Sequence, residues 1–305
     1  MAKTPRNHLH GWIVLDKPLG ISSTQALGKV RWLLNADKCG HGGTLDPLAS
    51  GVLPLAFGEA TKTVNWAMDG RKTYRFRVKW GAETSTDDLE GEVTASTGNA
   101  ALQHDIEAAL PQFIGAVQQK PPSYSAIKVS GERAYDLARA GATVDLAART
   151  VNIESIHIEN HDPAGETTFI VQCGKGTYVR SIARDLGRVL GCLGHVTLLR
   201  RLRVGPFSEK DAISLEFLEE LRNKPGSENS LSGILRPIET VLDGIPALAV
   251  MDPEAARLKQ GQRVLLPEGQ APSEAEAVLV THLGTPLGLF KIENRVLKAI
   301  RMFNL

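Results

Sequence analysis

The segment from Thr73 to Trp80 limits the possible folds of this chain more than any other. Its residues alternate between apolar and cationic side chains, as in a strand that is buried on one side. The apolar set is Tyr74, Phe76, Val78 and Trp80, and the cationic set is Arg75, Arg77 and Lys79. We therefore expect one face of this strand to be core and the other to be cationic.

Local patterns predict further elements on the N-terminal side. The run from Trp12 to Leu15 predicts a short buried strand, and residues 16–20 predict a turn. Residues 22–25 resemble a capping box and open a helix with apolar residues at helical spacing, namely Ala26, Leu27, Val30, Leu33 and Leu34. The Gly-rich stretch 40–51 predicts a loop that leads into an apolar strand at residues 52–57.

A later strand, residues 167–173, passes through a Gly-Lys-Gly turn into a helix with two stripes. The apolar stripe is Ile182, Ala183, Leu186, Val189 and Leu190, and the opposite stripe is Arg180, Arg184 and Arg188. Strands interleaved with helices, without a regular βαβ period, predict an α+β fold with a mixed sheet.

The 305 residues exceed the usual size of one domain. Residues 223–230 are polar and predict a flexible surface loop. Beyond about Ile245 the chain changes to short apolar runs separated by Gly and Pro, at residues 277–280, 287–292 and 297–303. We expect a larger domain at 1–245 and a small β-rich domain at 246–305.

Composition excludes several classes of protein and site. No signal-like or membrane-spanning apolar run is present, so we expect a cytoplasmic protein. The 3 cysteines form no CxxC pair, and no His/Cys group has metal-ligand spacing, so we expect reduced thiols and no metal site. The turn at Gly174 lacks the Walker pattern, and HExxH and GxSxG are absent.

Asp46 is a carboxylate placed among glycines. Pro47 biases its backbone to extended geometry, and Gly42, Gly43 and Gly51 would leave room for a substrate to approach the backbone. This arrangement suits a catalytic carboxylate. An Asp-Pro in a Gly-rich loop is more often a turn, and the residues alone favour that interpretation.

Six segments, taken together, resemble the TruB-type tRNA pseudouridine synthases over most of residues 11–207. They are LDKPLGISS (15–23), GHGGTLDPLASGVL (40–53), KTYRF (72–76), PPSYSAIK (121–128), GERAYDLARAG (131–141) and GTYVRSIARDLG (176–187). The resemblance implies a mixed-sheet pseudouridine synthase domain that isomerises uridine to pseudouridine at position 55 in the T loop of tRNA. It makes Asp46 the nucleophile, and the reaction needs no metal or other cofactor.

The resemblance also implies roles for two residues beside Asp46. Tyr74 would stack on the target base and serve as a proton-transfer group, whereas the alternation alone favours a core aromatic. Arg180 would pair with Asp46 and orient it for attack. For Arg184 and Arg188 an exposed helix charge is the better interpretation, unless they contact phosphate.

Five more positions are implied to lie at the substrate: Lys17, His41, Tyr178, Leu199 and Asp88. Lys17 could hold a loop or a backbone phosphate, and His41 could contact substrate or be a hydrogen-bonded loop residue. Leu199 is an apolar wall of the site or a core leucine. Asp88 is an acidic site residue or part of a solvated turn, because neighbouring Ser85 and Leu89 depart from the commoner family residues.

Binding of RNA must rest on local charge, because the net charge is only +1. The first basic cluster is Arg71, Lys72, Arg75, Arg77 and Lys79, and the second is Lys175, Arg180, Arg184, Arg188, Arg200, Arg201 and Arg203. We expect both clusters to bind phosphates in a salt-dependent way and the target uridine to be flipped out.

The C-terminal region resembles a PUA domain, which would grip the acceptor end of tRNA or merely add stability. We expect a monomer, since the family gives no reason for obligate assembly. Two alternatives stay open at this point. One is a tRNA chaperone without catalysis, and the other is an N-glycosidase that uses Asp46 with a second carboxylate such as Asp88.

Overall fold

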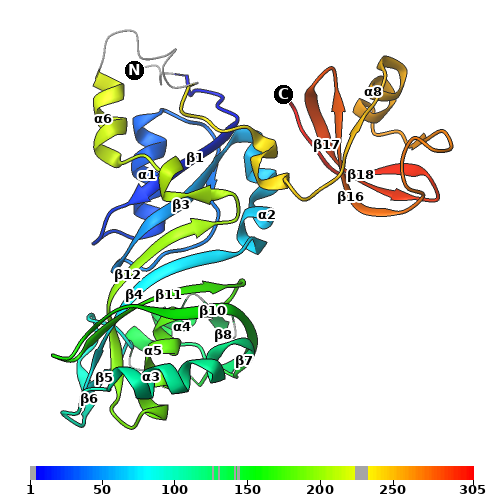
Figure 1. Cartoon of the computed structure of the whole chain (residues 1–305). Helices are drawn as coiled ribbons and strands as arrows, with labels where there is room; N and C mark the ends of the chain where they lie inside the picture. Colours follow the sequence, from blue (N-terminus) through cyan, green and yellow to red (C-terminus); the bar gives the residue numbers. More distant parts are fainter. Residues whose placement is uncertain (1–4, 126, 130, 141, 143–144, 224–232) are drawn as a thin grey trace.

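The computed structural model describes residues 5–125, 127–129, 131–140, 142, 145–223 and 233–305. Its largest sheet within these ranges has nine strands (Figure 1). The main path is β1 (Gly11–Lys17), β3 (Ala49–Phe57), β12 (Gly194–Val204), β4 (Lys72–Trp80), β11 (Glu166–Cys173), β10 (Arg149–Asp162) and β7 (Gly115–Gln119). β2 (Cys39–His41) pairs with β3, and β13 (Phe207–Ser208) pairs with β12. Since β3 and β12 are parallel and the other pairs antiparallel, the predicted mixed sheet is confirmed.

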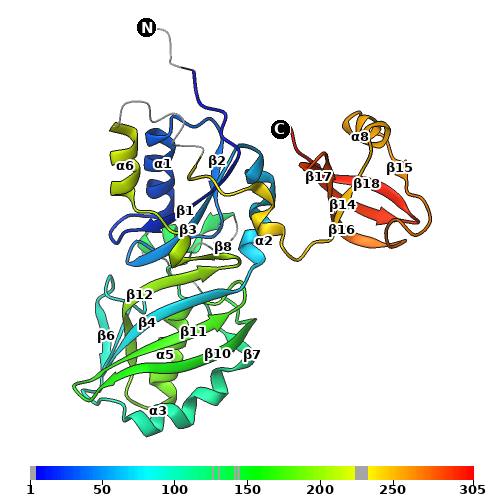
Figure 2. The same ribbon diagram turned by 45° about the horizontal axis from the view of Figure 1, so that its top comes forward.

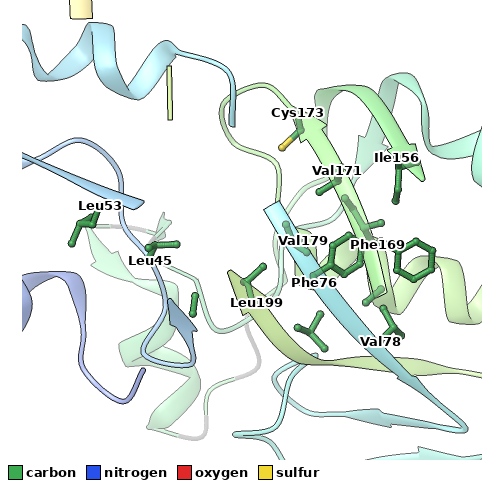
Figure 3. Close-up of a cluster of buried hydrophobic side chains, with 14 of the residues drawn as sticks. Leu45, Leu53, Phe76, Val78, Ile156, Phe169, Val171, Cys173, Val179 and Leu199 are labelled. Atoms are coloured by element: carbon green, nitrogen blue, oxygen red, sulfur yellow. The ribbon is translucent and has the colours of Figure 1, made fainter. Parts of the chain in front are cut away.

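Strand β4 has the two faces that its alternation predicts. Phe76 and Val78 are fully buried, and Lys79 is exposed. The Phe76 ring stacks on Phe169 of β11 with centroids 5.1 Å apart (Figure 3). Tyr74 is only partly buried and packs against the edge of this core.

The first helix, α1 (Ser23–Leu33), begins as predicted. Ser22 caps it and exchanges hydrogen bonds with Gln25, and Ala26 and Val30 are fully buried. The expected loop at 40–51 is shorter than predicted, because β2 pairs with β3 and the backbone of Ala49–Gly51 pairs with β12. The turn expected at residues 16–20 also begins later, since Asp16 and Lys17 still pair with β3.

Helix α5 (Val179–Val189) forms where predicted, but its two stripes differ from the prediction. Arg184 is only 7% exposed, and Val189 is 52% exposed. The expectation of an exposed Arg184 is therefore wrong, as is that of a buried Val189. The cause is a covering loop after β5 (Ala82–Thr84), which buries the arginine side of the helix.

One apolar core joins the large sheet to its helices. It contains side chains of α1, α5 and α3 (Gln103–Ala109) together with those of β4 and β11. Figure 2 shows α3 and α5 against the lower part of the sheet, with α1 beside β1. The core thus fixes α5, and the start of α5 lies beside the glycine-rich loop.

The remaining elements are short. The helical turns are η1 (Gly58–Thr63), α2 (Val64–Asp69), η2 (Leu110–Phe113), α4 (Ala134–Arg139), η3 (Glu209–Asp211), α6 (Leu215–Asn223) and η4 (Ile238–Leu242). The strands are β6 (Val93–Ser96), which pairs with β5, and β8 (Lys128–Val129), which pairs with β9 (Glu132–Arg133). The polar loop predicted at 223–230 falls, from residue 224 on, outside the described residues. In the ranges that the structure covers, no helix has the length and apolarity to cross a bilayer.

A five-stranded sheet forms the C-terminal part (Figure 1). It comprises β14 (Ala247–Ala249), β16 (Ala275–His282), β17 (Thr285–Glu293), β18 (Val296–Met302) and β15 (Val264–Leu265), with helix α8 (Asp252–Lys259). The three predicted apolar runs are the three long strands. Leu289 and Phe303 pack in one cluster with Trp12 and Phe207 of the large sheet, so the boundary at residue 245 stays a prediction.

Candidate active site

Asp46 lies in the loop between β2 and β3. Helix α1 holds this loop, since the Ser23 hydroxyl donates to the carbonyl of Leu45 at 3.1 Å and accepts its N–H at 2.8 Å. Gly42 and Gly51 pack against other segments, which corrects the prediction for these two, whereas Gly43 lines a pocket together with Asp46 and its part in substrate approach stays a prediction. A Cβ at Gly51, where φ is +100°, would lie 2.2 Å from the carbonyl oxygen of Arg201.

The guanidinium of Arg180 joins two carboxylates. Its Nη2 lies 2.9 Å from Asp46 Oδ2, and its Nη1 lies 3.2 Å from Asp88 Oδ2. It also donates to the backbone carbonyls of Thr86 and Tyr124, both at 2.9 Å. The Asp46 side chain is 40% exposed, whereas that of Arg180 is 6% exposed. A buried, fully bonded guanidinium therefore presents one half-open carboxylate to solvent.

Two hollows meet at Asp46. The tyrosine pocket, about 290 Å³, includes Lys72, Tyr74, Ser125, Tyr178 and Arg201 in its wall. The leucine pocket, about 330 Å³, includes Leu19, Leu48, Leu89 and Leu198. Asp46, Arg180 and Leu199 line both. Leu199 is 9% exposed and belongs to the core cluster, so it is at once a core leucine and a pocket wall (Figure 3).

Tyr74 and Tyr178 line the tyrosine pocket from two elements, β4 and the residue before α5. Burial raises the pKa of Tyr74, with the Arg201 guanidinium acting in the opposite direction. Burial likewise raises the pKa of Tyr178. Both phenols are therefore protonated at neutral pH and can donate hydrogen bonds to a bound group.

Arg201 is a site residue that the sequence analysis misplaced. It is 1% exposed and donates to the carbonyls of Val52 at 2.8 Å, Gly43 at 3.1 Å and Thr44 at 3.3 Å. It thus binds both sides of the loop that carries Asp46 and is not an exposed cation on an RNA-binding surface. The alternation along β12 could have predicted this burial, because Arg201 shares a face with the core residue Leu199 and not with Arg200.

Lys17 is fully buried and does not face RNA. Its Nζ donates to the carbonyls of Pro18 at 2.9 Å and Ile21 at 2.7 Å. Burial lowers the pKa of Lys17 to about 8, an effect that the charge of Asp46 opposes. Of the two predicted roles, holding the loop agrees with the structure, and a phosphate contact is wrong.

His41 is half-buried at the end of β2, and its Nδ1 is buried with no hydrogen-bond partner among the described residues. Burial and the nearby Arg201 lower its pKa, so the ring is neutral at pH 7. A substrate contact for His41 stays a prediction.

Asp87 and Asp88 form no solvated turn. They are 8% and 5% exposed, and Asp88 Oδ1 accepts from the Thr86 hydroxyl at 2.5 Å and the Glu90 N–H at 3.0 Å. The turn interpretation of Asp88 is therefore wrong, and the structure brings Asp88 to the site through Arg180.

Most cations of the two basic clusters are buried or paired with acids, although Lys79 and Arg203 form no ion pair among the described residues, and phosphate binding by the clusters stays a prediction. In the first cluster Arg71 pairs with Glu154, Arg75 with Glu159 and Arg77 with Glu166, and Lys72 is buried. In the second, Lys175 pairs with Asp69, Arg184 with Asp87, Arg188 with Glu83, and Arg200 with Asp16 and Glu209. These acids are distant in sequence, so a local count of charges cannot show them.

Comparisons with known proteins place the chain in a family. Residues 31–179 match the TruB family pseudouridylate synthase N-terminal domain, and residues 180–243 match the tRNA pseudouridylate synthase B C-terminal domain. The chain is 52% identical to tRNA pseudouridine synthase B of Nitrobacter winogradskyi, over 98% of this chain and 84% of that protein. It is 46% identical to the Brucella anthropi protein of the same name, over 97% of this chain and 96% of that one.

Solved structures share the fold. A Cbf5-Nop10-Gar1 complex contains a chain with 26% identity and a TM-score of 0.73, over 97% of this chain and 84% of that chain. An H/ACA RNP bound to a substrate RNA contains a chain with a TM-score of 0.75 at 23% identity, over 97% of this chain and 86% of that chain.

Proposed function

The chain belongs to the TruB family of pseudouridylate synthases, and on this basis we propose that it isomerises uridine to pseudouridine at position 55 in the T loop of tRNA. The observation that carries the proposal is the 2.9 Å contact between Arg180 and the half-exposed Asp46. No other carboxylate in the described walls of the two pockets combines such a fixed partner with access to solvent.

Asp46 is the proposed nucleophile. The reaction breaks the bond between C1′ and N1, turns the freed uracil and forms a bond between C1′ and C5, whose proton is lost to solvent. A carboxylate can form a covalent adduct during these steps or stabilise a cationic sugar. Arg180 orients Asp46 through charge-assisted hydrogen bonds, and its buried partners prevent it from swinging away.

The flipped uridine is proposed to enter the tyrosine pocket, with Tyr74 stacked on the base and Leu199 as the apolar wall. Taking a base out of the T loop costs a few kcal/mol, and stacking in the pocket offsets part of that cost. The protonated phenol of Tyr74 can donate a hydrogen bond to the base, and in the proposed proton-transfer role it would first have to give up that proton. Tyr178, His41 and Asp88 complete the proposed set of substrate-side residues, and Lys17 acts through its loop.

We further propose a PUA-like RNA-binding domain at residues 246–305 that grips the acceptor end, and a cytoplasmic monomer that needs no cofactor. The exposed unpaired cations of this part support the grip, since Lys259 and Arg263 form no ion pair among the described residues. Substitution of these two by Gln should raise KM and leave kcat unchanged. A fall in kcat alone would contradict the grip.

The decisive experiment uses tRNA with tritium at uridine C5. The wild type should release tritium to water and retain the base, and Asp46→Asn should bind tRNA yet release nothing. Free uracil would indicate an N-glycosidase. Tight binding by the wild type with no release would indicate a chaperone, and turnover by Asp46→Asn would remove Asp46 from the mechanism.

A further inference from the structure

Three arginines along α5 form a row of ion pairs with β5 and with the loop at residues 85–92 that joins β5 to β6. Arg180 pairs with Asp88 at 3.2 Å, and Arg184 pairs with Asp87 at 3.0 Å. At the outer end Arg188 pairs with Glu83 at 2.6 Å. Their side chains are 6%, 9% and 56% exposed in that order, so the row runs from the buried site to the surface. Only the first of the three arginines contacts Asp46.

The Arg184–Asp87 pair contacts the same two segments as Arg180, one around Thr86 and the other around residues 120–124. Arg180 donates to the carbonyls of Thr86 and Tyr124. Arg184 binds Asp87, next to Thr86, and donates to the carbonyl of Lys120 at 2.8 Å, four residues before Tyr124. Arg184, one helical turn after Arg180 on α5, therefore binds the same two segments to the helix and keeps the partners of Arg180 in place.

The backbone at Asp87 needs this tie. Its φ is +61°, a left-handed conformation that Asp and Asn tolerate better than most residues but that still costs free energy. Its carbonyl accepts the Val196 N–H at 3.0 Å, which anchors the loop to β12. Without the ion pair to Arg184, the loop should leave this conformation more readily. Thr86 and Asp88, the two neighbours of Asp87, would then move, and both are partners of Arg180.

We propose that the Arg184–Asp87 pair positions Arg180 against Asp46 and so acts on the rate of isomerisation without touching the substrate. The inference deepens the proposed function and rests on it. Neither residue lines either pocket, so neither can act by direct contact with a bound base. The expected effect falls on kcat, because a misdirected carboxylate slows chemistry more than it weakens RNA binding.

Protonation of Asp87 should weaken the Arg184–Asp87 pair near neutral pH. Burial raises the pKa of Asp87 to about 6, a shift that Arg184, Arg180 and Arg188 oppose and that Glu83 adds to. As pH falls through about 6, Asp87 loses its charge and the wild type should lose kcat. Asp87→Asn keeps the shape and the preference for positive φ and removes the charge, so it should lack this step.

The test measures tritium release by the wild type, Asp87→Asn, Arg184→Met, Arg184→Lys and the double variant. Asp87→Asn and Arg184→Met should lower kcat about tenfold at pH 7.5, with KM within about twofold of the wild type. Arg184→Lys should recover part of the loss. The double variant should be no worse than Arg184→Met, since that single change already removes the pair with Asp87 together with the contacts of Arg184 to Lys120 and Asp185.

Arg188→Gln is the matched control, because it removes an ion pair between the same helix and the adjoining strand β5, at the exposed end of the row. Its kcat should stay within about twofold of the wild type. An unchanged kcat in folded Asp87→Asn, a loss confined to KM, or an equal loss in Arg188→Gln would overturn the inference. If Arg184→Met fails to fold, Asp87→Asn and its pH profile decide. An inactive wild type would instead refute the proposed function.

Discussion

The exposed face of β4 and the inner face of α5 carry similar runs of arginine but use them differently. On β4, Arg75 pairs with Glu159 through side chains 39% and 37% exposed. On α5, Arg184 pairs with Asp87 through side chains 9% and 11% exposed. Exposed pairs contribute about 0–1 kcal/mol, whereas breaking a buried pair typically costs about 3–5 kcal/mol. Burial, and not the number of positive charges, decides what each cluster does.

The largest difference should appear when one partner is removed from each region. Arg180→Met leaves Asp88 buried without its cation, so we expect a loss of about 3–5 kcal/mol in the free energy of unfolding. Arg77→Gln on β4 should cost at most about 1 kcal/mol, because Glu166 stays solvated. Urea unfolding of both variants measures the contrast. Equal losses would mean that the α5 arginines are as solvated as those of β4.

The same contrast explains which parts of the fold the sequence could predict. The faces of β4 and the cap of α1 follow from spacing within a few residues, and both predictions are confirmed. The extension of β3 back to Ala49 depends on pairing with β12, far along the chain. Local pattern holds no information about that partner.

The residues of the candidate site also fall into two groups, those that local motifs predicted and those whose burial depends on distant segments. The family motifs pointed to Asp46 and Arg180, which the structure brings within 2.9 Å. Lys17 and Arg201 are buried cations that donate to backbone carbonyls; the sequence suggested a phosphate contact for Arg201 and either a phosphate contact or a loop-holding role for Lys17. The presence of a lysine or arginine in the sequence does not show whether its charge is exposed to solvent, because its exposure depends on which distant segments pack over it.

A second contrast concerns pH, because the two regions shift their acids in opposite directions. Burial raises the pKa of Asp87 from its ordinary value of 3.8 to about 6, so the folded protein binds this proton more tightly than the unfolded chain does. Stability from this group is therefore lowest above pH 6 and rises as pH falls toward 4. The hydrogen bond from Arg75 lowers the pKa of Glu159, so that group loses stability as pH falls below about 4.5.

Unfolding at pH 7.5 and pH 5 tests the sign. Asp87 should add about 1–1.5 kcal/mol to wild-type stability between these pH values, a gain that Asp87→Asn lacks. Glu159→Gln should change the difference by no more than a few tenths of a kcal/mol, since its titration lies lower. Parallel pH curves for the wild type and Asp87→Asn would show that Asp87 is not desolvated. A stability gain together with a loss of kcat would separate positioning from simple folding.

The smallest expected effect concerns RNA bound on the exposed face of β4. Lys79 forms no ion pair within the described ranges, whereas Arg75 is bound by both oxygens of Glu159 at 2.6 and 2.7 Å. A phosphate can use the charge of Lys79 directly but must displace Glu159 to use that of Arg75. Lys79→Gln should therefore reduce the slope of log Kd against log salt by about 1, and Arg75→Gln by less.

Glu159→Gln sharpens this test, because it frees Arg75 without adding a cation. If tRNA contacts this face, the variant should bind about two- to fivefold more tightly at low salt, a gain that disappears as salt screens the contact. Binding isotherms from 50 to 200 mM salt would measure it. If all three variants bind like the wild type, the cations on this face of β4 do not contact RNA, and RNA must be held by the cleft around Asp46 and by the C-terminal sheet.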